Sequence, residues 1–195
     1  MLSLVLRARS ADSALLVIDM QERIINTVAE KENLLHCLEA IIKASTLLNI
    51  PSVVTQQEKL GEITPIIKMS YPNDIAIFKK LVFSCCDVSE FRDKLQRLGR
   101  KTIVVCGIET HICVMQTVLD LLALKYEVLL LRDATSSYRI ADRETAIERM
   151  RDAGAWISTT ESVIYELMED AQRPEFKQIL QIIKNLRRQD NSSNS

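Results

Sequence analysis

The chain has 195 residues, of which 47% are hydrophobic and 26% are charged, a composition typical of globular proteins that excludes a disordered or fibrous chain. Lys and Arg number 25 against 26 Asp and Glu, so no overall positive field attracts nucleic acid or anionic lipid. The odd count of five cysteines favours reduced thiols over a disulfide framework.

The first residues, MLSLVLRARSADS, carry Arg7 and Arg9 and no acidic residue before Asp12. This segment faintly resembles a mitochondrial transit peptide and equally resembles a frayed terminus before a first strand. No apolar run reaches the roughly 20 residues that a membrane-spanning helix needs. We therefore expect a cytoplasmic protein without a membrane partner, with a mitochondrial location as the alternative.

Strands and helices alternate along the first half of the chain. Residues 14–18 (ALLVI) form a continuous apolar run, typical of a parallel strand buried on both faces. A helical stripe of Leu and Ile spans 33–48, and β-branched residues predict a second strand at 52–55. Gly and Pro within 56–73 indicate a long loop with one short helix, followed by a short strand at 75–78.

The second half continues the alternation. Asp87 and Glu90 form a capping-box signal for a helix over 87–98, with Gly99 as its C-cap, and 102–106 (TIVVC) is a buried strand. The other expected elements are a helix at 112–124, a strand at 127–131, a helix at 142–153, a strand at 156–159, and helices at 162–168 and 174–188.

Six strands with helical crossovers predict an α/β fold with three layers, α/β/α, around a central six-stranded parallel sheet. We expect one domain over residues 1–188, followed by a disordered tail over residues 189–195 (QDNSSNS).

Three polar side chains follow predicted strands, where parallel sheets bind their ligands: Asp19, Lys80 and Cys113. A cysteine in the first turn of a helix, near an ammonium group, favours the thiolate form. A carboxylate can take the thiol proton and return it to a leaving amine, and the turn over 107–113 offers backbone amides for an oxyanion. Each residue also has a structural explanation, as a cap, a surface charge or a small core side chain.

Five longer motifs favour the catalytic interpretation. They are LLVIDMQ (15–21), FKKLVFS (78–84), VVCGIETHICV (104–114), EVLLLRDATSS (127–137) and TTESVIYELM (159–168). In this order and spacing they closely resemble the isochorismatase-like cysteine hydrolase superfamily. The resemblance covers about residues 14–184, nearly the whole chain.

The resemblance implies a catalytic triad of Asp19, Lys80 and Cys113. The family pattern F-x-K-x-x-F-S selects Lys80 over its neighbour Lys79. The resemblance also implies a non-proline cis peptide bond before Glu109, and an oxyanion hole made by the backbone amides of Glu109 and Cys113.

One departure from family patterns concerns metal binding. Nicotinamidases of this superfamily carry Asp-x-His and a further His after the second strand, whereas this chain has TQQEKLGE at 55–62, and its only histidines are His36 and His111. We therefore expect no metal, no other cofactor and no nicotinamidase activity. The side chains expected to line the substrate pocket are Gln21, Gln56, Phe83 and His111.

The sequence thus predicts a cysteine hydrolase that cleaves a small amide or related acyl compound through an acyl-thioester on Cys113. The expected partner is a small molecule and not nucleic acid, and the resemblance implies a homo-oligomer. The alternative is a catalytically weak or inactive member that serves as an oligomeric interaction or scaffold protein. A lowered pKa of Cys113 favours the enzyme, and a value near the usual one of about 8.5 favours the scaffold.

Overall fold

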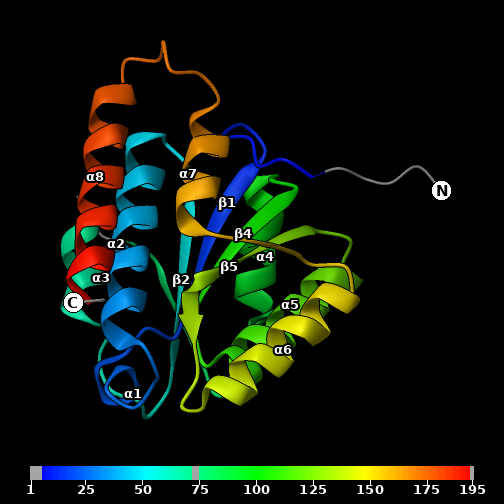
Figure 1. The fold of residues 1–195 in the computed structure, drawn as a ribbon. Helices are drawn as coiled ribbons and strands as arrows, with labels where there is room; N and C mark the ends of the chain where they lie inside the picture. The colour runs from blue at the N-terminus through cyan, green and yellow to red at the C-terminus, as the bar shows by residue number, and fades with distance from the viewer. Residues whose placement is uncertain (1–5, 72–74, 194–195) are drawn as a thin grey trace.

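The fold is built on one sheet of six strands in the order β3-β2-β1-β4-β5-β6, with every neighbouring pair parallel (Figure 1). The computed structural model describes residues 6–71 and 75–193. The transit-peptide hypothesis concerns the N-terminus, whose residues 1–5 lie outside the described residues. The strands are β1 (Ser13–Ile18), β2 (Ser52–Gln57), β3 (Ile77–Lys80), β4 (Thr102–Ile108), β5 (Glu127–Ser136) and β6 (Trp156–Ser158).

Helices connect these strands and cover both faces of the sheet. The helices are α1 (Glu22–Ile25), α2 (Lys31–Leu47), α3 (Pro65–Ser70), α4 (Ser89–Leu98), α5 (Met115–Ala123), α6 (Ile140–Asp152), α7 (Thr160–Met168) and α8 (Phe176–Ser193). Two shorter elements are a 3₁₀ turn, η1 (Cys85–Asp87), and a π-helical turn, η2 (Thr110–Val114). The predicted three-layer α/β/α architecture is confirmed.

Alternate residues of the central strands pack into two separate cores. In β1, Leu15 and Val17 face the core shared with α2, α7 and α8. Leu16 and Ile18 face the core shared with α4, α5 and α6. Figure 1 shows the two helical layers on opposite sides of the sheet. Burial on both faces explains why these strands are apolar without alternation.

The sheet reverses its winding direction between β1 and β4. The chain runs outward from β1 to β2 and β3, then returns to pair β4 with the other side of β1. Such a switch point creates a crevice beyond the carboxyl ends of the strands, where ligands bind in open α/β folds. Gly107 in β4 has a φ of +127°, and a Cβ there would lie 2.2 Å from the carbonyl oxygen of Ile18. Only glycine allows this close approach of the two strand ends.

The start of α4 differs from the predicted capping box. The helix begins at Ser89 after Val88, which makes no side-chain cap, and Asp87 belongs to η1 instead. The carboxylate of Glu90 accepts a hydrogen bond from the hydroxyl of Ser89. The capping-box prediction is wrong because a separate turn intervenes, whereas the C-cap at Gly99 is confirmed by its φ of +63°.

Two elements continue beyond their predicted ends. Strand β5 runs on to Ser136, beyond its predicted end at residue 131. The polar side chain of Asp133 fits within the strand because it accepts hydrogen bonds from Thr160 at the start of α7. Helix α8 continues past Arg188 to Ser193, where the sequence predicted a disordered tail, and no Gly or Pro lies there to stop it. Within the described residues, no helix is long and apolar enough to cross a membrane.

Candidate active site

The structure brings the three predicted catalytic side chains into contact. The Nζ atom of Lys80 lies 2.6 Å from Oδ2 of Asp19 and 3.4 Å from Sγ of Cys113. All three residues are buried, and Cys113 retains 7% of its exposure. The neighbouring Lys79 is exposed, as expected of a strand residue on the opposite face from Lys80.

Each member of this cluster comes from the end of a different strand. Asp19 follows β1 in the left-handed region, with a φ of +50°, and its backbone N–H donates to the carbonyl of Thr55 in β2. Lys80 is the last residue of β3, and Cys113 lies in η2 just after β4. A non-glycine residue at positive φ is uncommon and is found at functional sites. The parallel topology therefore concentrates the cluster at the switch point.

Lys80 is surrounded by acceptors. Besides Asp19 and Cys113, its Nζ contacts Oε1 of Gln57 at 2.6 Å and the carbonyl oxygens of Phe83 at 3.1 Å and Val82 at 3.3 Å. Burial lowers the pKa of Lys80, but the negative charge of Asp19 and smaller contributions from nearby thiols reverse this, so the pKa lies above its usual value. Lys80 is therefore an ammonium cation at neutral pH.

Cys113 differs electrostatically from its sequence-based prediction. Burial and, to a lesser extent, the charge of Asp19 raise its pKa to about 12, and Lys80 offsets only part of this rise. The predicted lowering of this pKa is wrong, because desolvation of the thiolate outweighs one nearby ammonium. Cys113 is therefore a protonated thiol at neutral pH.

Asp19 is held from its other side by β2. The hydroxyl of Thr55 donates to Oδ1 of Asp19 at 2.8 Å, and Sγ of Cys85 lies 3.7 Å from the same hydroxyl. Burial and the charge of Asp19 raise the pKa of Cys85 to about 11, so this second thiol is also protonated. The carboxylate thus has one oxygen for Thr55 and one for Lys80.

Hydroxyl groups brace the turn that carries Cys113. The peptide bond between Ile108 and Glu109 is cis, at the position that the family resemblance implied. Thr117 donates to the carbonyl of Cys113 at 2.7 Å, and Thr135 donates to the carbonyl of Gly107 at 2.8 Å. These contacts fix the backbone between β4 and α5, which contains the amides expected to bind an oxyanion.

The four predicted pocket residues have different surroundings. Gln21 is buried, and its side chain bonds to the backbone of Gln57 and to the carbonyl of Gly61. Gln56 lines a small cavity of about 300 Å³ with Glu58, Lys59 and Lys79, whose lining contains none of the three clustered residues. Phe83 is 54% exposed. The Nδ1 atom of His111 lies 2.9 Å from the hydroxyl of Ser137.

Two side chains that bond to side chains of the cluster were not predicted. Thr55 holds Asp19, and Gln57 holds Lys80. The two-residue period of a strand could have indicated them, because Thr55 and Gln57 share one face of β2 and Gln56 points to the other. Choosing the correct face needed the sheet register, which pairs Gln57 with Lys80.

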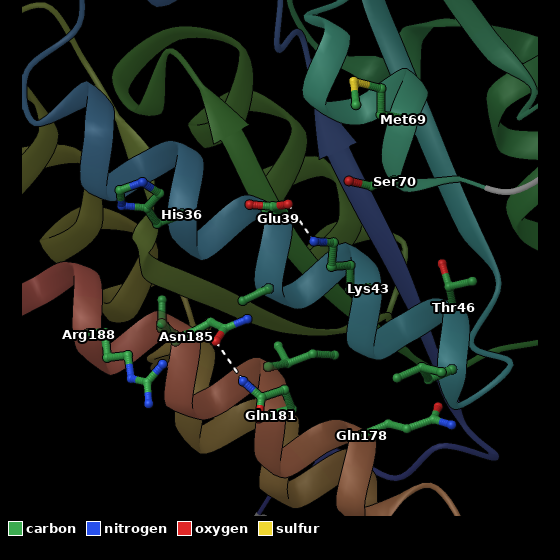
Figure 2. A pocket seen from close by; sticks show the side chains of 14 residues that line it. His36, Glu39, Lys43, Thr46, Met69, Ser70, Gln178, Gln181, Asn185 and Arg188 are labelled. Atoms are coloured by element: carbon green, nitrogen blue, oxygen red, sulfur yellow. Dashed lines mark hydrogen bonds and ion pairs between the residues drawn. The ribbon is translucent and has the colours of Figure 1, made fainter.

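A larger cavity, of about 790 Å³, lies elsewhere, between α2, α3 and α8. Figure 2 shows polar side chains along its rim, including an ion pair of Glu39 with Lys43 at 2.5 Å and a hydrogen bond of Gln181 with Asn185 at 2.8 Å. None of its lining residues belongs to the cluster. In residues 6–71 and 75–193, no group of three or more His, Cys, Asp or Glu is placed to hold a metal ion.

Comparison with known proteins gives relatives of similar length. A secreted isochorismatase effector of Phytophthora sojae (strain P6497) is 38% identical over 177 residues, covering 88% of this chain and 84% of the relative. Isochorismatase domain-containing protein 2 of Xenopus laevis is 34% identical, covering 88% of this chain and 83% of the relative.

Solved structures show the same architecture. A Caenorhabditis elegans structure named as MAR1 ribonuclease is 33% identical, with a TM-score of 0.87 and coverage of 91% of this chain and 92% of that chain. Escherichia coli YcaC, named as an octameric hydrolase of unknown specificity, has a TM-score of 0.88 at 22% identity, with coverage of 98% of each chain, which shows the shared fold. The model of the isochorismatase domain matches residues 13–162, and the chain therefore belongs to the isochorismatase family.

Proposed function

We propose that this protein is a cysteine hydrolase that cleaves a small amide or related acyl compound through an acyl-thioester on Cys113. Membership of the isochorismatase family supports a hydrolase. The observation that carries the finer proposal is the buried triangle in which Lys80 contacts Oδ2 of Asp19 at 2.6 Å and Sγ of Cys113 at 3.4 Å. A nucleophile, a base and a cation meet there at the switch point of the sheet.

The first half of the reaction forms the thioester. Asp19 takes the thiol proton of Cys113 as Sγ attacks the substrate carbonyl carbon, and the electron pair of the carbonyl bond moves onto its oxygen. Backbone amides of Glu109 and Cys113 receive this oxyanion. The pair then returns, the carbon–nitrogen bond breaks, and Asp19 gives its proton to the leaving amine.

The second half uses water. Asp19 accepts a proton as water attacks the thioester carbonyl. The carbon–sulfur bond then breaks to release a carboxylic acid, and Asp19 returns its proton to the sulfur of Cys113. Throughout, the ammonium of Lys80 stabilises negative charge on sulfur and on Asp19. Because its pKa is raised, Cys113 lacks the resting thiolate that would have favoured the enzyme over the scaffold. The proposed cycle does not need one, because the thiol proton passes to Asp19 as the sulfur attacks.

Release of ammonia from a panel of small primary amides tests this function, with acetamide, propanamide, benzamide and nicotinamide as members. We expect turnover of at least one simple amide and none of nicotinamide. Cys113→Ala should abolish turnover, whereas Cys37→Ala, a matched loss of a thiol in α2, should retain it. Full turnover by Cys113→Ala would overturn the proposal, and absence of turnover by the unaltered protein across amides and esters would favour the scaffold alternative.

RNA belongs in the same panel because the Caenorhabditis elegans relative is named as a ribonuclease. Cationic and anionic side chains are balanced in this chain, at 25 and 26, so it has no net attraction for a phosphate backbone. We expect no RNA cleavage that depends on Cys113. Cleavage lost in Cys113→Ala would instead assign the cluster to a nuclease.

We further propose that the protein forms a homo-oligomer. The E. coli structure is named as octameric, and three consecutive apolar residues in this chain, Leu81, Val82 and Phe83, are exposed by 63%, 41% and 54%. Such a run on a monomer surface favours association. Light scattering after size-exclusion chromatography should give a mass at least twice the 22.2 kDa of one chain. A monomer at all concentrations would contradict the proposal.

A further inference from the structure

We propose that Gln57 is a positioning residue that holds one N–H of Lys80 away from Cys113, and thereby keeps Cys113 in its thiol form between turnovers. The inference rests on the proposed function of the cluster. It assigns a role to a residue of β2 that contacts Lys80 and, within residues 6–71 and 75–193, makes no hydrogen bond with Cys113.

The number of hydrogens on Lys80 makes its contacts competitive. An ammonium group has three N–H donors, yet Nζ faces acceptors on Asp19, Gln57, Phe83, Val82 and Cys113. The two shortest contacts, both 2.6 Å, go to Asp19 and Gln57. One remaining N–H is thus shared among the carbonyls of Phe83 and Val82 and the sulfur of Cys113.

Three further contacts fix the orientation of Gln57. Its Nε2 donates to the carbonyl of Leu81 at 3.0 Å, and its Oε1 accepts from Lys80. A flipped amide would place Oε1 against the Leu81 carbonyl oxygen and Nε2 against the Lys80 ammonium, so neither hydrogen bond could form. Its backbone N–H and carbonyl both bond to the side chain of Gln21, at 2.8 Å and 2.9 Å. Gln57 is therefore a pre-oriented acceptor with no freedom to release Lys80 by rotating its amide in place.

The electrostatics of Cys113 agree with this competition. The titratable groups that act on Cys113 are Asp19 and Lys80, and those that act on Lys80 are Asp19, Cys85 and Cys113. Burial and the charge of Asp19 raise the pKa of Cys113 to about 12, and the ammonium at 3.4 Å from its sulfur offsets only part of this rise. A cation whose N–H groups are already engaged by oxygen acceptors stabilises a thiolate less than a cation directed at the sulfur.

Two substitutions at position 57 should change the reactivity of Cys113 in opposite directions. Gln57→Met removes the competing acceptor at similar size, so we expect alkylation of Cys113 by iodoacetamide near pH 8 to accelerate about threefold to tenfold. A lower pKa of Cys113 gives more thiolate, and the lower intrinsic nucleophilicity of that thiolate limits the gain. Gln57→Glu adds a stronger acceptor and a negative charge, so alkylation should slow by a similar factor. Peptide mass spectrometry measures labelling at Cys113.

The background variant Lys80→Met shows whether Gln57 acts through Lys80. There Gln57→Met should have no effect on labelling, because no ammonium remains to be redirected. Gln178→Met, the same chemical change on the exposed face of α8, should leave labelling unchanged, and thermal unfolding should show that each variant is folded. If Gln57→Met fails to fold, Gln57→Glu alone decides.

Labelling that changes in the same direction in both variants, stays unchanged, or responds equally without Lys80 would overturn the inference. Faster labelling with Gln57→Met and slower labelling with Gln57→Glu would support it. The readout does not depend on turnover. If the protein hydrolyses an amide but labelling of Cys113 does not respond to substitution of Gln57, the role of Gln57 is refuted and the proposed function stands. If the protein hydrolyses nothing, the proposed function is refuted whatever the labelling shows.

Discussion

The two most site-like regions of the molecule have opposite properties. The groove between α2, α3 and α8 has a volume of about 790 Å³, and on its rim Glu39 forms an ion pair with Lys43 (Figure 2). The cluster of Asp19, Lys80 and Cys113 is buried, and the ammonium of Lys80 contacts both a carboxylate and a thiol. Size alone would select the groove, whereas chemistry selects the cluster.

The difference follows from what surrounds each region. Helix surfaces that meet at an angle leave a groove wherever their side chains do not interlock, without bringing reactive groups together. Parallel strand ends at a switch point instead converge from distant parts of the sequence. The proposed reaction therefore belongs to the cluster and not to the groove.

The largest effect on activity is expected from Cys113→Ala. Loss of the nucleophile should reduce turnover by roughly 10³-fold or more, as measured by ammonia release from the best amide of the panel. The groove provides the contrast: Gln181→Ala removes only an exposed hydrogen bond to Asn185 and should leave turnover within about twofold. A larger loss for Gln181→Ala than for Cys113→Ala would reverse the assignment of the site.

The largest effect on stability is expected from Gly107→Ala. A Cβ there would lie 2.2 Å from the carbonyl oxygen of Ile18, so β1 and β4 would have to separate, at a cost of roughly 3–5 kcal/mol in the free energy of unfolding. Gly154→Ala is the matched control, because its φ is +111° with no atom within 4 Å of the added Cβ, and it should cost about 1–2 kcal/mol. Urea unfolding of both variants measures the difference, and equal costs would contradict the close approach.

Asp19→Asn should separate turnover from thiol reactivity. Without its general base the protein should lose about 10²-fold or more in turnover. Because the charge of Asp19 raises the pKa of Cys113, its removal should nevertheless speed alkylation of that thiol at a fixed pH. Iodoacetamide labelling measures the second effect, and slower labelling in the folded variant would show that Asp19 does not act on Cys113 in this way.

Alkaline pH should destabilise the protein through its buried thiols. In the unfolded chain cysteines titrate near 9, whereas burial raises the pKa of Cys85 to about 11. Between these values the unfolded state releases a proton that the folded state keeps, so the free energy of unfolding falls as pH rises, by up to about 1.4 kcal/mol per pH unit for each such thiol. Unfolding curves at several pH values test this, and Cys85→Ala should flatten the slope; an unchanged slope would contradict the contribution of Cys85.

The smallest effect is expected in the groove. Lys43→Ala breaks an ion pair with Glu39 whose side chains are about half and one third exposed, so stability should change by no more than about 0.5 kcal/mol. Turnover should not change. A marked loss of turnover in this folded variant would indicate that the groove communicates with the cluster.

Each residue of the cluster could be predicted from the short stretch of sequence around it. Lys80 ends a strand, and Asp19 and Cys113 follow strands, so the parallel topology brings them to one edge of the sheet. The apolar runs of β1 and β4 likewise predicted a sheet covered on both faces, since such strands have no solvent face. Motif order selected Lys80 over Lys79, and the structure has the former buried and the latter exposed.

Features that depend on register and burial were not predictable in the same way. Gln57 and Thr55 contact the cluster only because β2 lies between β1 and β3, and its two faces are not distinguished by composition. The pKa of Cys113 depends on how much water the fold removes, which outweighed the nearby cation. The capping signal at Asp87 failed because a turn uses that residue before α4 begins.

The central claim is that Cys113 carries the acyl group, and rapid-quench mass spectrometry with para-nitrophenyl acetate tests it most directly. If Cys113 forms an acyl-thioester, we expect a burst of para-nitrophenolate and a transient acetyl group on the peptide that contains Cys113. Both should be missing in Cys113→Ala. Turnover of the ester with no acetylated intermediate, or with the acetyl group on another residue, would contradict it.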